Sequence, residues 1–128
     1  MTYRTNQYQE SSDPFDQLPT SGDIAEAKQK KHDEWLRAGR EIAMDPDVIN
    51  VLVKDAKRFL MRTGNCSLDL AMRYKSRLPG FEPEHSVMLA GIAEELVTRF
   101  RAKGYYATVS NSGDDKNILC VKVPGDEE

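Results

Sequence analysis

Reactive side chains are scarce in this 128-residue chain, which has two cysteines and two histidines. Cys66 and Cys120 lie far apart and match neither CxxC nor a zinc-ligand spacing. This argues against a structural zinc site and against a disulfide framework. We expect both thiols to be reduced, as is usual in the cytosol, although the sequence leaves a bond between them open.

Long apolar runs are also missing, and no stretch approaches the roughly 20 residues that a helix needs to cross a bilayer. Residues 1–10 lack the basic and then apolar order of a secretory signal. The chain is 39% hydrophobic and 30% charged, which is typical of globular proteins. These features predict a cytoplasmic protein with one compact domain and no membrane partner.

Neither sign of charge is in large excess, because the net charge is only −3. Attraction to DNA or RNA would therefore need a local basic patch. The motifs GxGxxG, Walker A, GxSxG and HExxH are absent, which argues against dinucleotide enzymes, P-loop NTPases and the common hydrolases. We predict no catalytic residue, no cofactor and no small-molecule substrate.

The first 19 residues are polar, with scattered apolar side chains and no helix or strand period. This composition predicts a disordered N-terminal arm. Phe15 and Leu18, flanked by acids and prolines, are candidate contacts for a partner protein, and a solvated tail is the alternative.

A helix is predicted over residues 20–44, because Thr20 and Asp23 have the spacing of a capping box. Its apolar stripe is thin, so we expect a peripheral, weakly amphipathic helix that is docked only from Trp35 onward. Trp35 is a further candidate contact for a partner protein.

Three core helices are expected within residues 45–124. The first begins at Asp45-Pro46-Asp47, has an apolar face through Met61 and ends before Gly64-Asn65. A shorter helix is predicted over 67–77. The third runs from Pro83 to Lys103 and is apolar over more than one stripe.

After Gly104 the apolar period changes to two, which predicts strands over 105–110 and 118–123 joined by a loop. Two strands alone are marginally stable, so this hairpin should lie on the helices or extend a sheet. One of Tyr105 and Tyr106 is expected to face outward, with Tyr106 as a candidate protein contact beside a strand edge and ordinary strand propensity as the alternative. Residues 125–128 form an acidic tail. The predicted fold is α+β and mainly helical, with three core helices, a C-terminal β-hairpin and the peripheral helix.

His85 is the more interesting of the two histidines, because Glu82 and Glu84 precede it at a predicted helix start, whereas His32 is expected to be exposed on the weak first helix. A metal site is a remote exception to the non-catalytic interpretation. Neighbours in sequence do not share a helical face, and acids are favoured at helix N-termini in any case.

Three helices followed by a hairpin have the topological order of a winged helix, in which the third helix enters the major groove. Against this analogy, Glu82 and Glu84 would repel phosphate at the end that reads bases. A basic patch for single strands is the other nucleic-acid hypothesis, with Tyr74 stacking on bases. The candidate cations are Arg73, Lys75, Arg77, Arg99, Arg101 and Lys103.

We therefore expect a small non-catalytic binding protein, an adaptor or modulator that acts through a protein partner or self-association. A nucleic-acid-binding regulator is the alternative. Such a chain could serve a virus or mobile element as readily as a cell.

Overall fold

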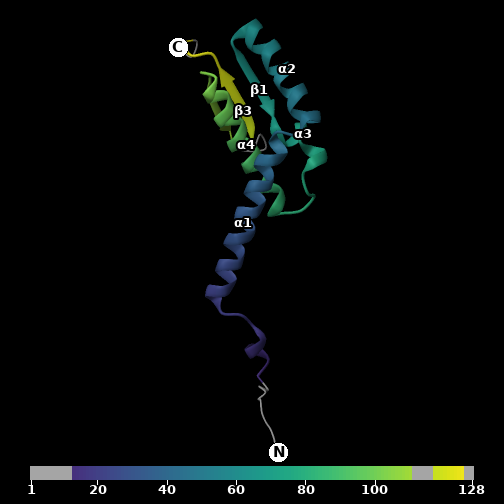
Figure 1. The fold of residues 1–128 in the computed structure, drawn as a ribbon, viewed down its shortest axis with the longest axis vertical. Coiled ribbons are helices and arrows are strands. Elements are labelled where there is room, and N and C mark those ends of the chain that lie inside the picture. Colours follow the sequence, from purple (N-terminus) through teal and green to yellow (C-terminus); the bar gives the residue numbers. More distant parts are fainter. Residues whose placement is uncertain (1–12, 111–116, 126–128) are drawn as a thin grey trace, which may run out of the picture. The chain divides into compact units, whose positions relative to one another are not determined.

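The computed structural model describes residues 13–110 and 117–125, and the chain forms two compact units, 1–31 and 32–128 (Figure 1). In the first unit, Pro14–Gln17 form a short 3-10 helix, η2, capped by Asp13. The Asp13 carboxylate accepts a hydrogen bond from the amide of Phe15 (3.0 Å), which gives residues 13–17 a local turn, and the disorder of the arm stays a prediction. The remainder of the expected arm, residues 1–12, lies outside the described residues.

Helix α1 spans Ser21–Ala43, as the capping pattern predicts. The hydroxyl of Thr20 accepts a hydrogen bond from the amide of Asp23 at 3.1 Å, which satisfies one of the free donors of the first turn. In the second unit, α1 is exposed at residues 32–34, half-buried at Trp35, and buried at Gly39 and Ala43. Docking from Trp35 onward is therefore confirmed.

Two long helices of the second unit agree with their sequence signals. Helix α2 spans Pro46–Thr63, with Asp45 as its cap, and it ends at Gly64 in the left-handed conformation (φ 79°). Helix α4 spans Glu84–Ala102. The confirmed ends show that the local acid, proline and glycine signals set these boundaries.

The segment predicted as a helix over 67–77 has a different structure. Residues Asn65–Asp69 form a strand, β1, followed by a single α-helical turn, α3 (Leu70–Arg73), and a 3-10 turn, η3 (Lys75–Arg77). Alternate burial of Cys66 and Leu68 is a strand pattern, and the Asp69 side chain caps α3. The helical expectation was wrong for residues 67–69, where tertiary pairing overrides local propensity, and it is met only by two short turns over 70–77.

The sheet contains the predicted hairpin, with β2 at Tyr106–Ser110 and β3 at Ile118–Lys122. Its strand order is β1-β3-β2 and both pairings are antiparallel, so Cys120 lies opposite Ser67 on one side and Thr108 on the other. The hairpin therefore extends a sheet, as its marginal stability requires. The hairpin loop, residues 111–116, and the acidic tail beyond Gly125 lie outside the described residues.

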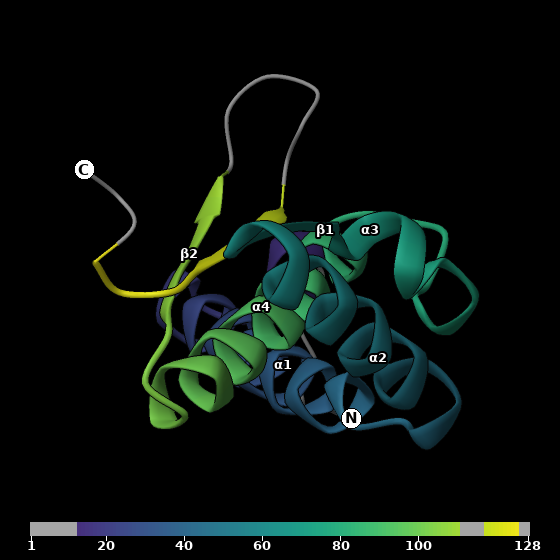
Figure 2. The same cartoon turned by 90° about the horizontal axis from the view of Figure 1, so that it is seen from above.

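The core lies between one face of the sheet and the helices. Helix α2 packs against β1 and α4 packs against β2 (Figure 2). The other face of the sheet carries exposed side chains, among them Tyr106, Thr108 and Lys122. The fold is thus α+β and mainly helical. The largest fully buried side chains are Leu52, Leu68, Leu70, Tyr74, Ile92, Leu96, Leu119 and Val121.

The two cysteines lie on opposite faces of this sheet. Cys66 pairs in register with Val121, the residue after Cys120, and successive strand residues point to opposite sides. Both thiols are free, as the sequence predicts. Burial raises the pKa of the Cys66 thiol above its usual value, which favours the neutral form of this side chain.

Two close contacts hold the second part of α1 in place. Gly39 and Gly91 lie where α1 and α4 meet, and a Cβ on either residue would overlap a backbone carbonyl of the other helix. The hydroxyl of Tyr74 donates a hydrogen bond of 2.8 Å to the carbonyl of Ala43, the last residue of α1. Among the helices of the described ranges, none combines the length and the apolar character needed to span a bilayer.

Candidate protein-binding groove between α2 and α4

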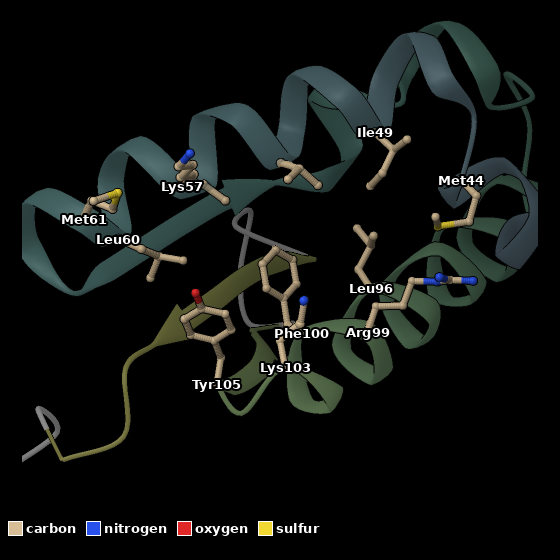
Figure 3. Close-up of a pocket in the computed structure, with 12 residues that line it drawn as sticks. Met44, Ile49, Lys57, Leu60, Met61, Leu96, Arg99, Phe100, Lys103 and Tyr105 are labelled. Atoms are coloured by element: carbon tan, nitrogen blue, oxygen red, sulfur yellow. The ribbon is translucent and has the colours of Figure 1, made fainter.

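An open groove of about 280 Å³ lies between α2, α4 and Tyr105. Figure 3 shows Ile49 on α2 and Leu96 on α4 pointing toward each other across it, with Leu60 and Tyr105 nearer its other end. We call it the α2–α4 groove. Its apolar lining consists of Met44, Ile49, Val53, Ala56, Leu60, Met61, Leu96, Phe100 and Tyr105, and its cations are Lys57, Arg99 and Lys103.

The groove results from the helical spacing of apolar residues beyond those needed for the core. On α2, Ile49, Val53 and Ala56 are separated by four and three positions, so they lie along one side of the helix. On α4, Leu96 and Phe100 repeat at four positions. Phe100 also packs edge-to-face on Tyr105, with ring centroids 6.1 Å apart, which fixes the floor at the end of the groove.

Apolar side chains at the mouth of the groove are left in solvent. Val53 is 49% exposed and Met61 is 78% exposed. Large apolar side chains that adjoin an apolar depression are typical of surfaces that bind a partner, whereas single exposed apolar residues are ordinary. The methionine is unbranched and flexible, which allows it to adjust to an incoming side chain.

The charged groups of the groove are all positive. Lys57 lies on the α2 wall, while Arg99 and Lys103 lie one turn apart on α4. Arg99 donates to Glu95 at 2.6 Å, but this pair is on the surface because the arginine side chain is 56% exposed. None of the twelve lining residues is a carboxylate. The lining therefore combines an apolar floor with a positive rim.

Tyr74 is not available for base stacking, which corrects the sequence-based hypothesis. Its side chain is fully buried, and its hydroxyl is used by Ala43. Burial, with a smaller effect of the charge on Asp45, raises the pKa of Tyr74 to about 12. Tyr74 is thus a core residue that supports the end of α1.

Two of the predicted basic contacts are held by carboxylates. Arg73 forms an ion pair with Asp55 (3.0 Å). Arg77 donates through Nε to Asp45 and lies 3.3 Å from Asp47. The hydrogen bond from Arg77 holds the pKa of Asp45 below its usual value. These arginines fix the segment after β1 to α2.

The other four cations do not form one patch with these arginines. Arg99 and Lys103 line the α2–α4 groove, whereas Arg101 donates through Nε to the carbonyl of Ala107 on β2 (3.1 Å). Lys75 is exposed on η3. Asp55, the partner of Arg73, is two positions from the groove residues Val53 and Lys57 and hence on the opposite side of α2.

The helix that would enter DNA in a winged-helix arrangement is covered where it would read bases. From Glu84 to Ala93, Ser86 alone is exposed, and the other nine residues are buried or half-buried. Part of this cover comes from α1, which contacts α4 at Gly91. The N-terminal half of α4 therefore offers no continuous polar face to a major groove.

The neighbourhood of His85 also differs from a metal centre. Its Nδ1 atom lies 2.9 Å from the carbonyl oxygen of Pro79, and Glu82 accepts a hydrogen bond from the hydroxyl of Ser86. Within the described ranges, no three His, Cys, Asp or Glu side chains come together as a metal-binding group.

The candidate protein contacts lie in different places. Phe15 and Leu18 are exposed in the first unit, on and beside η2. Trp35 is half-buried on α1, and Tyr106 is 52% exposed on β2, an edge strand. None of these four residues lines the α2–α4 groove. Sequence reasoning did not find the groove, although the excess of apolar residues on α4 was a visible signal.

Comparison with known proteins gives no family for this chain: no family model matches it, and neither a curated protein nor a solved structure is significantly similar.

Proposed function

We propose that the protein is a non-catalytic adaptor or modulator that receives apolar side chains of a partner protein in the α2–α4 groove. The observation that carries this proposal is the coincidence of an apolar depression with the exposed side chains of Val53 and Met61 at its mouth. Burying such surface stabilises a complex by roughly 25 cal/mol per Å² before the costs of association.

The same groove favours contact between helices. A hydrophobic groove between two helices can bind the apolar face of an amphipathic helix from another protein. Val53 and Met61 lie eight positions apart on α2, so a partner would contact this wall over about two turns. Substitution of either residue leaves the fully buried core side chains in place.

Site-specific cross-linking in the native cellular setting tests the proposal. A photoreactive amino acid replaces Val53 in one variant and Met61 in another. A third variant carries it at Met72, which is 71% exposed on α3 but does not line the groove. The cross-linked products are then identified by mass spectrometry.

We expect the same partner to be cross-linked from positions 53 and 61, and not from position 72. Self-association is a form of the proposed activity, and it would yield a product of twice the mass of the chain. Absence of a product from both groove positions would overturn the proposal, as would equal cross-linking from Met72.

We also propose that the protein works in the cytoplasm. Support comes from Cys66 and Cys120, which are both free and lie on opposite faces of the sheet. Reduced thiols are usual in that compartment. Fluorescence localisation in the native cell, with a tag at either end of the chain, tests this assignment.

A further inference from the structure

We infer that the occupant of the α2–α4 groove is an acidic amphipathic helix of a partner protein, whose carboxylates flank its apolar face. This inference rests on the proposed function and adds the chemistry of the partner. It is carried by the charge of the lining, which includes Lys57, Arg99 and Lys103 and no carboxylate.

The groove has the length that a short helix needs. Its α2 wall runs from Ile49 to Met61, which is about 18 Å at 1.5 Å per residue. This length accommodates about three helical turns. A helix lying along the wall would direct side chains at positions i, i+3, i+4 and i+7 onto the apolar lining between α2 and α4.

The cations lie on both walls, so a helix in the groove would have positive charge on each side. Lys57 belongs to α2, Arg99 belongs to α4, and Lys103 caps the C-terminal end of α4. Within the part of the chain that the structure describes, Lys57 and Lys103 form no salt bridge. Arg99 donates to Glu95 at 2.6 Å, so its charge is offset within α4, and Lys57 and Lys103 are the groove cations that carry the preference for an acid.

Charge would select the partner, while apolar contact would supply most of the affinity. Ion pairs at a solvent-exposed rim contribute little each, but like charges facing one another disfavour the wrong partner. A basic helix would bring its ammonium groups against Lys57 and Lys103, beside Arg99 with its partner Glu95. An acidic helix would neutralise them, and its binding would weaken as salt is added.

The test uses two fluorescent 16-residue peptides with blocked ends. Each has leucine at positions 5, 8, 9 and 12; one has glutamate at every flanking position, and the other has lysine there. Fluorescence anisotropy measures the affinity of each for the full chain at low and at high salt. We expect the glutamate peptide to bind roughly tenfold or more tightly than the lysine peptide at low salt.

A triple variant with Lys57→Glu, Arg99→Glu and Lys103→Glu should reverse this preference. Circular dichroism shows whether the triple variant folds. If it does not, Lys103→Glu alone, at an exposed residue, is used instead and should reduce the preference for the glutamate peptide. Lys75→Glu is the matched control, because Lys75 is an exposed lysine outside the groove. It should leave the preference unchanged.

Equal binding of the two peptides would overturn the acidic assignment, as would an equal effect of Lys75→Glu. Failure of both peptides to bind would overturn it as well. The cross-links from Val53 and Met61 test partner docking separately, so a failure of the acidic assignment can be told from a failure of the proposed function. Light scattering measures whether the protein forms a dimer. If peptide binding is lost under conditions where the dimer forms, the groove is occupied by a second copy of the chain instead.

Discussion

Gly39 on α1 and Gly91 on α4 bring the two helices into backbone contact, and the Cα of Gly39 lies 3.2 Å from where a Cβ on Gly91 would be. Each glycine faces a carbonyl of the opposite helix, that of Met88 for Gly39 and that of Leu36 for Gly91. A methyl group at either position would therefore displace backbone, which is less able to move than the end of a side chain.

Gly39→Ala and Gly91→Ala should each lower the free energy of unfolding by about 2–3 kcal/mol, the upper part of the range for overpacking. Urea denaturation followed by circular dichroism measures this change. Gly80→Ala is the control, because no atom lies within 4 Å of a Cβ at that position and its effect should stay within about 0.5 kcal/mol. A similar small effect at Gly39 would contradict the close crossing.

Removal of one hydroxyl tests the contact between Tyr74 and α1. Tyr74→Phe should cost about 1–2 kcal/mol, because the Ala43 carbonyl loses its buried donor. Tyr106→Phe, at an exposed tyrosine, should be close to neutral. Denaturation midpoints of the two variants measure the difference, and equal midpoints would contradict the hydrogen bond.

The same tyrosine predicts a loss of stability at alkaline pH. The pKa of Tyr74 is about 12 in the folded protein and about 10 in an unfolded chain. The unfolded state therefore releases the proton first, and stability falls as the pH rises between these values. Wild type should lose more stability than Tyr74→Phe over this range, which thermal unfolding at each pH measures. If the stability of wild type and of Tyr74→Phe fell equally with pH, the raised pKa of Tyr74 would be contradicted.

The ion pair between Asp45 and Arg77 predicts a loss of stability in acid. The pKa of Asp45 is lowered in the folded protein, so its contribution is fully present above the usual aspartate value of about 3.9. It is lost as the pH falls through the lower folded-state pKa. Asp45→Asn should thus melt earlier than wild type near pH 7, and the two should converge in acid.

In that variant, asparagine keeps the side-chain oxygen that accepts from the amide of Asp47, so the cap of α2 is retained. Asp47→Asn is the control, because the Asp47 side chain is exposed and lies farther from Arg77. If Asp45→Asn still melted earlier than wild type at low pH by the same margin, its destabilisation would come from the helix cap and not from the lost charge.

Binding to DNA should be weak and should not depend on Arg73 or Arg77. Both guanidinium groups are held by carboxylates, so replacing them with alanine should lower stability more than affinity for single- or double-stranded DNA. Anisotropy at two salt concentrations measures this. A steep salt dependence that flattens in these variants would favour the nucleic-acid alternative.

Strong local signals explain which parts of the fold were predictable. The Asp45-Pro46-Asp47 start and the Gly64 end gave α2 its correct bounds, since capping depends on neighbours in sequence. Strand β1 was missed because Asn65, Ser67 and Asp69 are weak strand formers, and their strand conformation comes from pairing with β3. That pairing joins residues far apart in the chain.

The candidate site was less predictable for a similar reason. Apolar residues such as Val53 and Phe100 could equally lie on a fully buried helix face. The sequence does not show which of them stay at the surface and line a groove. The predicted basic residues do not gather in one patch, because Arg73 and Arg77 pair with acids at α2 while the others lie elsewhere. Tyr74 is buried because its segment turns inward after β1. Tertiary contacts determine each of these outcomes.

Strand β3 is the middle strand of the sheet but is synthesised after both of its neighbours. A growing chain that ends before Ile118 can form helices, yet β1 and β2 then have no strand between them. At roughly 5–20 residues per second, synthesis from the end of β2 at Ser110 to the end of β3 at Lys122 takes about one to two seconds. Folding of the second unit should therefore be a late event of translation, and chains released before Lys122 should be substrates for chaperones and proteases.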